Sequence, residues 1–185
     1  MMTTVKGYFK FIIVTFGLFG FGNFYHGQAQ QGWMLGAAPS SEIDNSIFGA
    51  NARLYFGVND HFCFGPEITL FPYQEIDDEN ELKILDLNLN AHYIFELTHK
   101  LGVYPLTGVN YTEEKERLVA LQEEEEEEKE NGLGLNYGFG AHYNLHNLYV
   151  FAEFKGVAGK LSAEFVTVGV ILPLLKSPLK KDHTE

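Results

Sequence analysis

Five ionisable residues stand in stretches of the chain that are otherwise rich in apolar residues: Arg53, Glu67, Asp86, Glu153 and Lys155. Two carboxylates held close together can serve as a general acid and a general base. The same carboxylates matched with arginine and lysine form ion pairs instead, because buried charges are tolerated only when they are paired and hydrogen-bonded. Which chemistry applies depends on the elements that position the five side chains.

Eight segments are predicted to be β-strands, and seven of them show the two-residue alternation of a half-buried strand. The eight segments cover residues 32–38, 46–56, 62–70, 85–95, 101–111, 133–143, 148–156 and 161–172. In the second segment, Phe48 and Leu54 fall on one face and Arg53 falls on the other. Pro66 and Pro105 lie within two of the segments, and because proline cannot donate to a ladder we expect bulges or local breaks there.

The faces of these segments differ in polarity: one is apolar, and the other carries glycine, asparagine, histidine and charged residues. This predicts an all-β chain folded as an eight-stranded antiparallel up-and-down transmembrane β-barrel, with lipid outside and polar groups inside. A soluble ligand-binding barrel also has eight up-and-down strands, but its cavity is lined by apolar groups. In water the apolar face would form a patch larger than the roughly 300–600 Å² that soluble monomers show. The pattern therefore favours a membrane barrel.

The chain begins with the features of a secretory signal peptide. Lys6 and Lys10 precede an apolar run, and the small residues Gly27 and Ala29 mark a cleavage site before Gln30. At about a dozen residues, the run is shorter than the roughly 20 that a membrane-spanning helix needs. The sequence thus predicts a signal peptide over 1–29, the barrel over 30–174 and a short periplasmic tail over 175–185.

The balance of charge excludes one class of partner. Removing the leader takes two of the 13 basic residues and leaves 11 against 25 acidic residues, a formal charge of −14. Such a chain repels phosphate backbones, so no nucleic-acid partner is expected. Cys63 is the single cysteine, which excludes an intramolecular disulfide although the leader predicts export.

The expected connections alternate in length. Tight turns at 58–60, 97–99 and 145–147 alternate with longer polar segments at 39–45, 73–81 and 112–131. Outer-membrane barrels alternate short periplasmic turns with longer outer loops in this way. Because the leader places the amino terminus in the periplasm, the acidic segments are expected outside the cell.

Two stretches look familiar, Gly102-Val-Tyr-Pro-Leu-Thr-Gly108 and Gly134-Leu-Asn-Tyr-Gly-Phe-Gly-Ala-His-Tyr143. With the strand pattern over 31–174, they resemble the small eight-stranded outer-membrane β-barrel proteins of the OmpA-transmembrane-domain and OmpX type, in the outer membrane protein beta-barrel domain family. The resemblance implies a barrel in the outer membrane of a Gram-negative cell. Proteins of that kind usually end on an aromatic residue, whereas this chain runs past Leu172 into a basic tail.

In such a barrel the alternation assigns all five ionisable residues to the lumen. With the 58–60 turn setting the register, Arg53 falls opposite Gly65 and diagonal to Glu67, within reach of a long side chain. Across the next connection, Glu67 is expected beside Asp86 or Asn88.

This placement gives a specific hypothesis for the lumen. Arg53 bridges Glu67 and Asp86, while Lys155 pairs with Glu153 or with a carboxylate across the lumen. Acid–base catalysis by the same carboxylates is disfavoured, because a lumen filled by side chains offers no substrate entrance.

Two other sets of side chains carry weaker chemical signals. His92 and His142 are expected to point inward, where they could ligate a metal or relay protons, but no third ligand accompanies them and hydrogen-bonded fillers explain them better. Ser40, Ser41 and Ser46 lie near the rim, where a lipid A-modifying enzyme would need a serine beside a histidine. The sequence contains no His-x-Ser pair.

Six consecutive glutamates stand in the 112–131 segment: Glu123, Glu124, Glu125, Glu126, Glu127 and Glu128. Like charges in a block repel one another, which favours a solvated loop. The alternative is that the block attracts divalent cations at the lipopolysaccharide surface, or a basic partner.

These patterns predict a non-enzymatic integral outer-membrane protein with a structural or surface-interaction role and a lumen filled by side chains. No cofactor is expected. Expected partners are outer-membrane lipids and lipopolysaccharide, with divalent cations at the acidic outer loops. Two alternatives stay open, a narrow solute or ion channel and a lipid A-modifying enzyme, and the sequence names no specific ligand, protein partner or oligomeric state.

Overall fold

The computed structural model of the protein describes residues 32–77, 80–118 and 127–174, so the predicted signal peptide and tail lie outside the described residues. Within these ranges the chain forms nine strands: β1 (Gly32–Glu42), β2 (Ile47–Gly57), β3 (Phe62–Glu75), β4 (Asn80–Tyr93), β5 (Phe95–Glu96), β6 (Leu101–Leu118), β7 (Glu127–Asn144), β8 (Tyr149–Gly159) and β9 (Ala163–Pro173). No helix in the described part of the chain is long and apolar enough to cross a membrane.

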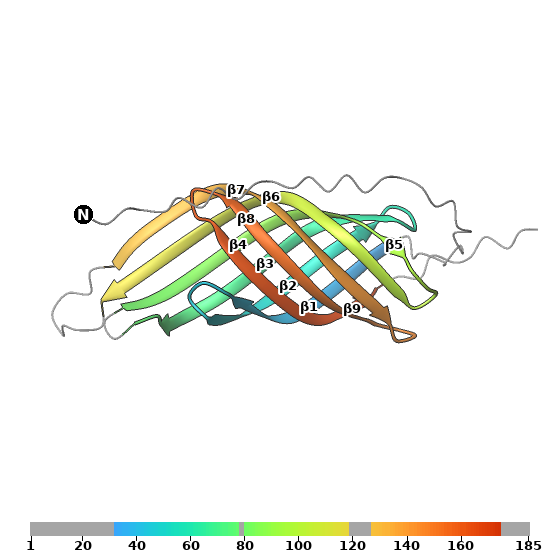
Figure 1. Ribbon diagram of the computed structural model, residues 1–185, viewed down its shortest axis with the longest axis horizontal. Coiled ribbons are helices and arrows are strands. Elements are labelled where there is room, and N and C mark those ends of the chain that lie inside the picture. The colour runs from blue at the N-terminus through green and yellow to red at the C-terminus, as the bar shows by residue number, and fades with distance from the viewer. Residues whose placement is uncertain (1–31, 78–79, 119–126, 175–185) are drawn as a thin grey trace, which may run out of the picture.

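The strands form one closed antiparallel sheet, in which they cross the barrel obliquely (Figure 1). Their order is β4-β3-β2-β1-β9-β8-β7-β6-β5, and an additional β4–β6 pairing closes the ring. Because β5 follows β4 after only Ile94 and pairs with the same neighbour, β6, the two act as one interrupted strand. The predicted eight-stranded antiparallel up-and-down barrel is therefore confirmed.

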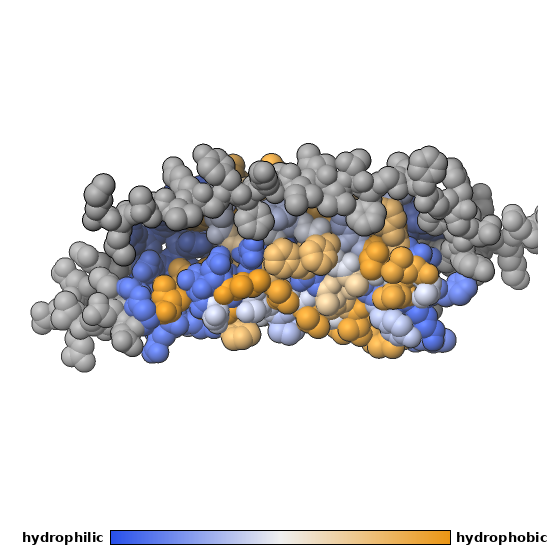
Figure 2. Space-filling view, viewed as in Figure 1, coloured by the Kyte–Doolittle hydropathy of each residue, from blue (hydrophilic) through white to orange (hydrophobic). Residues whose placement is uncertain are grey.

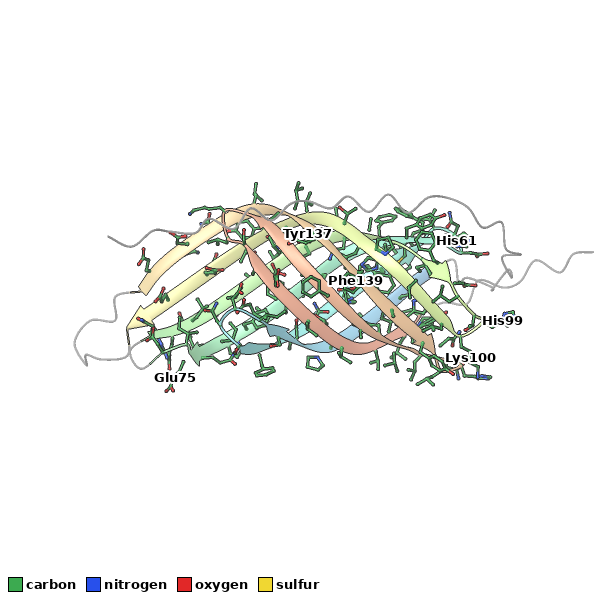
Figure 3. The ribbon with its side chains drawn as sticks, viewed as in Figure 1. His61, Glu75, His99, Lys100, Tyr137 and Phe139 are labelled. Carbon is green, nitrogen blue, oxygen red and sulfur yellow. The ribbon has the colours of Figure 1, made fainter. Side chains whose placement is uncertain are left out.

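The two ends of the barrel differ in the connections that they carry. Residues 58–61, 97–100 and 145–148 form one end, here called the turn end. The described connections 43–46 and 160–162, together with the ends of β3, β4, β6 and β7 at Glu75, Asn80, Leu118 and Glu127, form the opposite end, here called the acidic end. In Figure 3, His61, His99 and Lys100 lie at the turn end and Glu75 lies at the acidic end.

The expected alternation of short turns and long loops is wrong in one respect, because much of the polar sequence at the acidic end is strand. β6 and β7 are 18 residues each and remain paired as far as Arg117↔Glu127, deep into the segment expected to be a loop. The physical reason is that the segment keeps a period-two alternation of charge, which a β-ladder accommodates. The structure thus turns an expected loop into a long hairpin.

The apolar face of the strands points outward, as predicted. Phe48, Leu133 and Phe139 are 67%, 77% and 66% exposed, far above what a soluble core allows. Figure 2 shows hydrophobic residues gathered along the middle of the visible wall and hydrophilic residues toward both ends. Tyr137 and Phe139 lie on this wall, between the two ends (Figure 3).

Pro66 and Pro105 each interrupt one ladder without shifting its register. Pro66 pairs with Leu89 of β4, but no pair is formed where it faces β2. Pro105 pairs with Phe139 of β7, but the other side of β6 has a gap between β4 and β5. The expected local breaks are therefore present, and they fall where the missing proline N–H would have donated.

Candidate functional site

All five ionisable residues of the predicted lumen are buried inside the barrel and lie close together. Arg53 projects from β2, Glu67 from β3, Asp86 from β4, and Glu153 and Lys155 from β8, and none is more than 4% exposed. The pleat of each strand explains this, because alternate residues face the same side. The group is here called the lumen network.

The ion pairs within the lumen network differ from the hypothesis. Arg53 lies 3.3 Å from Glu67 and 3.1 Å from Glu153. Lys155 Nζ lies 2.8 Å from both Glu67 and Asp86. The hypothesis that Arg53 bridges Glu67 and Asp86 is thus wrong about Asp86. Lys155 pairs with carboxylates across the lumen, the second of its two expected arrangements.

A turn longer than the expected one accounts for the pairing of Arg53 with Glu67. The connection between the paired residues Gly57 and Cys63 spans 58–62, two residues more than the expected 58–60 turn, so Arg53 faces Glu67 directly and not Gly65. The Asn59 side chain stabilises the longer turn, since its Oδ1 accepts the N–H groups of residues 61 and 62 at 2.9 Å. The expected neighbourhood of Glu67 is confirmed, since it pairs with Asn88.

Hydroxyl and amide groups donate further hydrogen bonds to the carboxylates, although Glu153 Oε1 is buried without a hydrogen-bond partner among the described residues. Tyr55 donates to Glu67 at 3.0 Å, and Tyr104 donates to Glu153 at 3.1 Å. Asp86 accepts from Asn88 at 2.7 Å, from Thr112 at 3.0 Å and from Asn110. Sequence reasoning missed these partners, although the inward positions of the tyrosines and asparagines followed from the same alternation.

Glycines make room for the largest members of this interior. A Cβ atom at Gly36 would lie 2.6 Å from Arg53 Cγ, and one at Gly140 would lie 2.5 Å from the Tyr104 ring. These distances are below any ordinary contact between side chains. The alternation of small and large inward residues is how narrow barrels fit their contents.

An apolar cluster lies inside the barrel between the lumen network and the acidic end. It consists of Ile47, Phe71, Leu82, Ile84, Val157, Ala163 and Phe165. Phe71 and Phe165 stack at 5.6 Å and are 0% and 1% exposed. The prediction of a uniformly polar interior is therefore incomplete. Four members of the cluster lie just beyond the expected strand segments, namely Phe71, Leu82, Ile84 and Val157, whereas Ile47, Ala163 and Phe165 lie within them as inward apolar residues.

A cavity of about 460 Å³ opens at the turn end and is lined in part by Tyr55, Cys63, His92, Tyr104 and His142. The Tyr104 ring stacks between two histidine rings. Its centroid lies 4.8 Å from that of His92 and 6.1 Å from that of His142. Cys63 is buried, with its Sγ 3.8 Å from His92 Nδ1. No group of three or more metal-ligating side chains occurs among the described residues.

At the acidic end, the inward-facing side of the strands carries several glutamates. Glu42, Glu114 and Glu130 belong to the inward-facing set of the pleat, together with Glu116 and Glu128. Of the six predicted cation-attracting glutamates, Glu123, Glu124, Glu125 and Glu126 lie outside the described residues, whereas Glu127 and Glu128 begin β7.

Comparison with known proteins gives one family and several similar structures. A sequence profile described as outer membrane protein beta-barrel domain matches residues 7–170. No curated protein matches the chain.

Three similar solved structures are outer-membrane barrels. Ail, the attachment invasion locus protein of Yersinia pestis, has a TM-score of 0.54 and 17% identity, covering 76% of this chain and 95% of Ail. The N-terminal β-barrel domain of Pseudomonas aeruginosa OprF has a TM-score of 0.56 and 15% identity, covering 78% of this chain and 98% of that domain. Neisserial surface protein A has a TM-score of 0.51 and 17% identity, and the match covers 80% of this chain and 100% of that protein. At these identities the likeness concerns the fold alone.

The family match and the architecture agree. The profile spans most of the chain, and the structure is a closed barrel with an apolar outer wall and a charged, hydrogen-bonded interior. Such a distribution suits a wall in contact with lipid. The protein is an outer-membrane β-barrel, and the chain belongs to the outer membrane protein beta-barrel domain family.

Proposed function

We propose that the protein is a non-enzymatic, non-conducting outer-membrane barrel with a structural or surface-interaction role, its acidic end facing the outside of the cell. The single observation that carries the proposal is the lumen network, in which two cations and three carboxylates from β2, β3, β4 and β8 meet across the interior. Such a network ties opposite walls together. A second obstruction, the stacked pair of Phe71 and Phe165, lies nearer the acidic end.

Planar-bilayer recording tests the closed interior. We expect the purified barrel to give no conductance steps where a general porin, reconstituted in the same bilayers, gives them. Barrels of eight strands leave an interior just wide enough for side chains, which supports this expectation. Regular conductance steps from the wild-type protein would contradict the proposal and favour a narrow channel.

The orientation of the barrel is part of the proposal. Residues 1–29 act as a signal peptide, and the amino terminus of the barrel at Gly32 lies at the turn end, beside Leu174. On this proposal the turn end faces the periplasm. Labelling of whole cells with a membrane-impermeant maleimide tests it, since Asp44→Cys at the acidic end should react and Thr98→Cys at the turn end should not. The reverse pattern would contradict the orientation.

The contacts of the rim serines support a non-enzymatic role. Ser40 Oγ lies 2.8 Å from Thr167 Oγ1, and Ser41 Oγ donates to the backbone carbonyl of Glu42. Neither partner is a base that activates a hydroxyl for attack on an acyl group. Mass analysis of lipid A from cells with and without expression should show identical species. A new acylation state would favour the enzyme.

The charge of the acidic end supports cationic surface partners. One structure of Ail was solved with a heparin analogue, sucrose octasulfate, but a polyanion of that kind would be repelled by the glutamates here. We propose that divalent cations gather at this end. Calorimetric titration with Ca²⁺ should show weaker binding when residues 123–128 are all changed from Glu to Gln. Equal binding by the two proteins would eliminate this proposal.

A further inference from the structure

A thiol and an imidazole meet at the wall of the cavity at the turn end. Cys63 of β3 pairs with His92 of β4, and both residues line this cavity of about 460 Å³. Cys63 Sγ lies 3.8 Å from His92 Nδ1. Thiolate sulfur and imidazole nitrogen are the donors that Zn²⁺ most often takes in proteins.

The separation of the two atoms suits a metal ion between them. Zinc bonds measure about 2.3 Å to sulfur and about 2.0–2.1 Å to a histidine nitrogen. At the observed 3.8 Å, an ion bonded to both atoms would make an S–Zn–N angle of about 120°. This angle is close to tetrahedral, whereas a linear arrangement would require a separation of about 4.3 Å. The spacing therefore favours a tetrahedral ion such as Zn²⁺.

The other ring nitrogen of His92 faces a carboxylate. His92 Nε2 lies 3.8 Å from Glu153 Oε2, and both residues are buried. Among the described residues, neither His92 Nε2 nor Glu153 Oε1 has a hydrogen-bond partner. When Nδ1 of a histidine binds a metal, Nε2 carries the proton, and it usually donates this proton to a carboxylate or a carbonyl group. The two unpartnered atoms are thus the donor and the acceptor that such an arrangement uses.

The formal charge of the lumen network also points to a missing cation beside Glu153. The ion pairs of the network form a chain in which acids and bases alternate, in the order Asp86, Lys155, Glu67, Arg53 and Glu153. The chain begins and ends on a carboxylate, so its formal charge is −1. One Zn²⁺ ion with one thiolate carries a net charge of +1. Because buried charges need compensation, an ion on the far side of the His92 ring would balance the network.

We propose that Cys63 and His92 bind a zinc ion at the wall of the turn-end cavity, and that Glu153 positions the imidazole through its Nε2–H. The ion replaces the thiol proton, which is released to the solvent. Water from the cavity completes the coordination. With two protein donors in place of the four of a structural zinc site, the ion is exchangeable. This inference goes beyond the proposed function and requires neither its orientation nor its closed lumen.

Titration of the detergent-purified full barrel with Co²⁺ tests the proposal. The protein is first reduced with a reductant that does not bind metals. We expect a thiolate-to-cobalt charge-transfer band in the near ultraviolet, which Zn²⁺ should remove by displacing the cobalt. The affinity should rise with pH, because binding releases the thiol proton. Co²⁺ held by glutamates at the acidic end gives no such band, so the readout is specific to Cys63.

Four variants assign the donors. Cys63→Ser should abolish the band. His92→Gln keeps an N–H group for Glu153 but lacks the Nδ1 donor, and it should lower the affinity for Co²⁺ at least about tenfold. Glu153→Gln should keep the band and lower the affinity about tenfold, the usual effect of losing a carboxylate that holds a metal-ligating histidine. The matched control is His142→Gln, which changes the other histidine of the cavity, on the far side of the Tyr104 ring, and should leave band and affinity unchanged.

Each variant is first checked for folding by its shift between unboiled and boiled samples on a gel. Absence of the band in the reduced wild type would overturn the proposal, as would a band that persists in Cys63→Ser. Unchanged affinity in folded His92→Gln would also overturn it, and unchanged affinity in Glu153→Gln would overturn the positioning role of Glu153. Should His92→Gln fail to fold, the wild type and Cys63→Ser still decide whether the thiol binds the ion.

Discussion

Replacement of Arg53 by methionine is the sharpest test of the lumen network. The guanidinium contacts Glu67 and Glu153, lies 4.2 Å from the centre of the Phe151 ring, and donates to Asn51 at 2.9 Å. Methionine keeps the volume of the side chain while removing its charge. The change therefore isolates electrostatics from packing.

The expected cost follows from what each carboxylate retains. Glu67 keeps Lys155 at 2.8 Å and Tyr55 at 3.0 Å, whereas the hydrogen bond that remains to Glu153 is the one from Tyr104. Glu153 would thus be left as a buried charge without a cation at hydrogen-bond distance. We expect Arg53→Met to lower the free energy of unfolding by about 3–5 kcal/mol, the usual cost of breaking a buried pair.

Urea unfolding in lipid vesicles provides the measurement, followed by the fluorescence of Trp33. This is the single tryptophan of the chain, and it is 43% exposed on the outer wall. The matched control is Lys160→Met, which removes a cation from a pair with Glu130 whose side chains are 60% and 50% exposed. The control should cost no more than about 1 kcal/mol, because exposed pairs contribute little.

The double variant Arg53→Met/Glu153→Gln separates the network from other effects. Neutralising the stranded carboxylate should restore at least about half of the lost stability, since the buried uncompensated charge is the main cost. A cost below about 1 kcal/mol for Arg53→Met would refute the reasoning. So would a double variant that is no more stable than the single one.

Three further substitutions probe the wall, the apolar cluster and the fit of the interior. Phe139→Arg, on the mid-wall outer face, should cost about 2–4 kcal/mol of unfolding free energy in vesicles, and a neutral result would argue against contact with lipid. Phe71→Ala removes the ring stacked on Phe165 and should cost about 3–5 kcal/mol in the same urea titration; unchanged stability would mean that the cluster does not hold the barrel together. Gly140→Val pushes a side chain against the Tyr104 ring and should cost about 1–3 kcal/mol, so a stabilised variant would contradict the packing described.

The sequence by itself determined the faces of the strands and hence the class of fold. Alternation is a local property, since successive residues of a strand point to opposite sides. It was enough to assign Arg53 and Lys155 to the interior and Phe48 and Phe139 to the wall. The prediction of a signal peptide and the finding of a single cysteine came from the sequence and needed no tertiary information.

Only the tertiary structure decided which charges meet. β2 and β3 are joined by a longer turn than the alternation of residues indicates, in which Asn59 Oδ1 accepts two backbone N–H groups, and Arg53 lies opposite Glu67. The pairing of Arg53 with Glu153, 100 residues away, depends on how the sheet closes. Neighbours across a lumen are set by the stagger and closure of the whole barrel, and no short stretch of sequence encodes these.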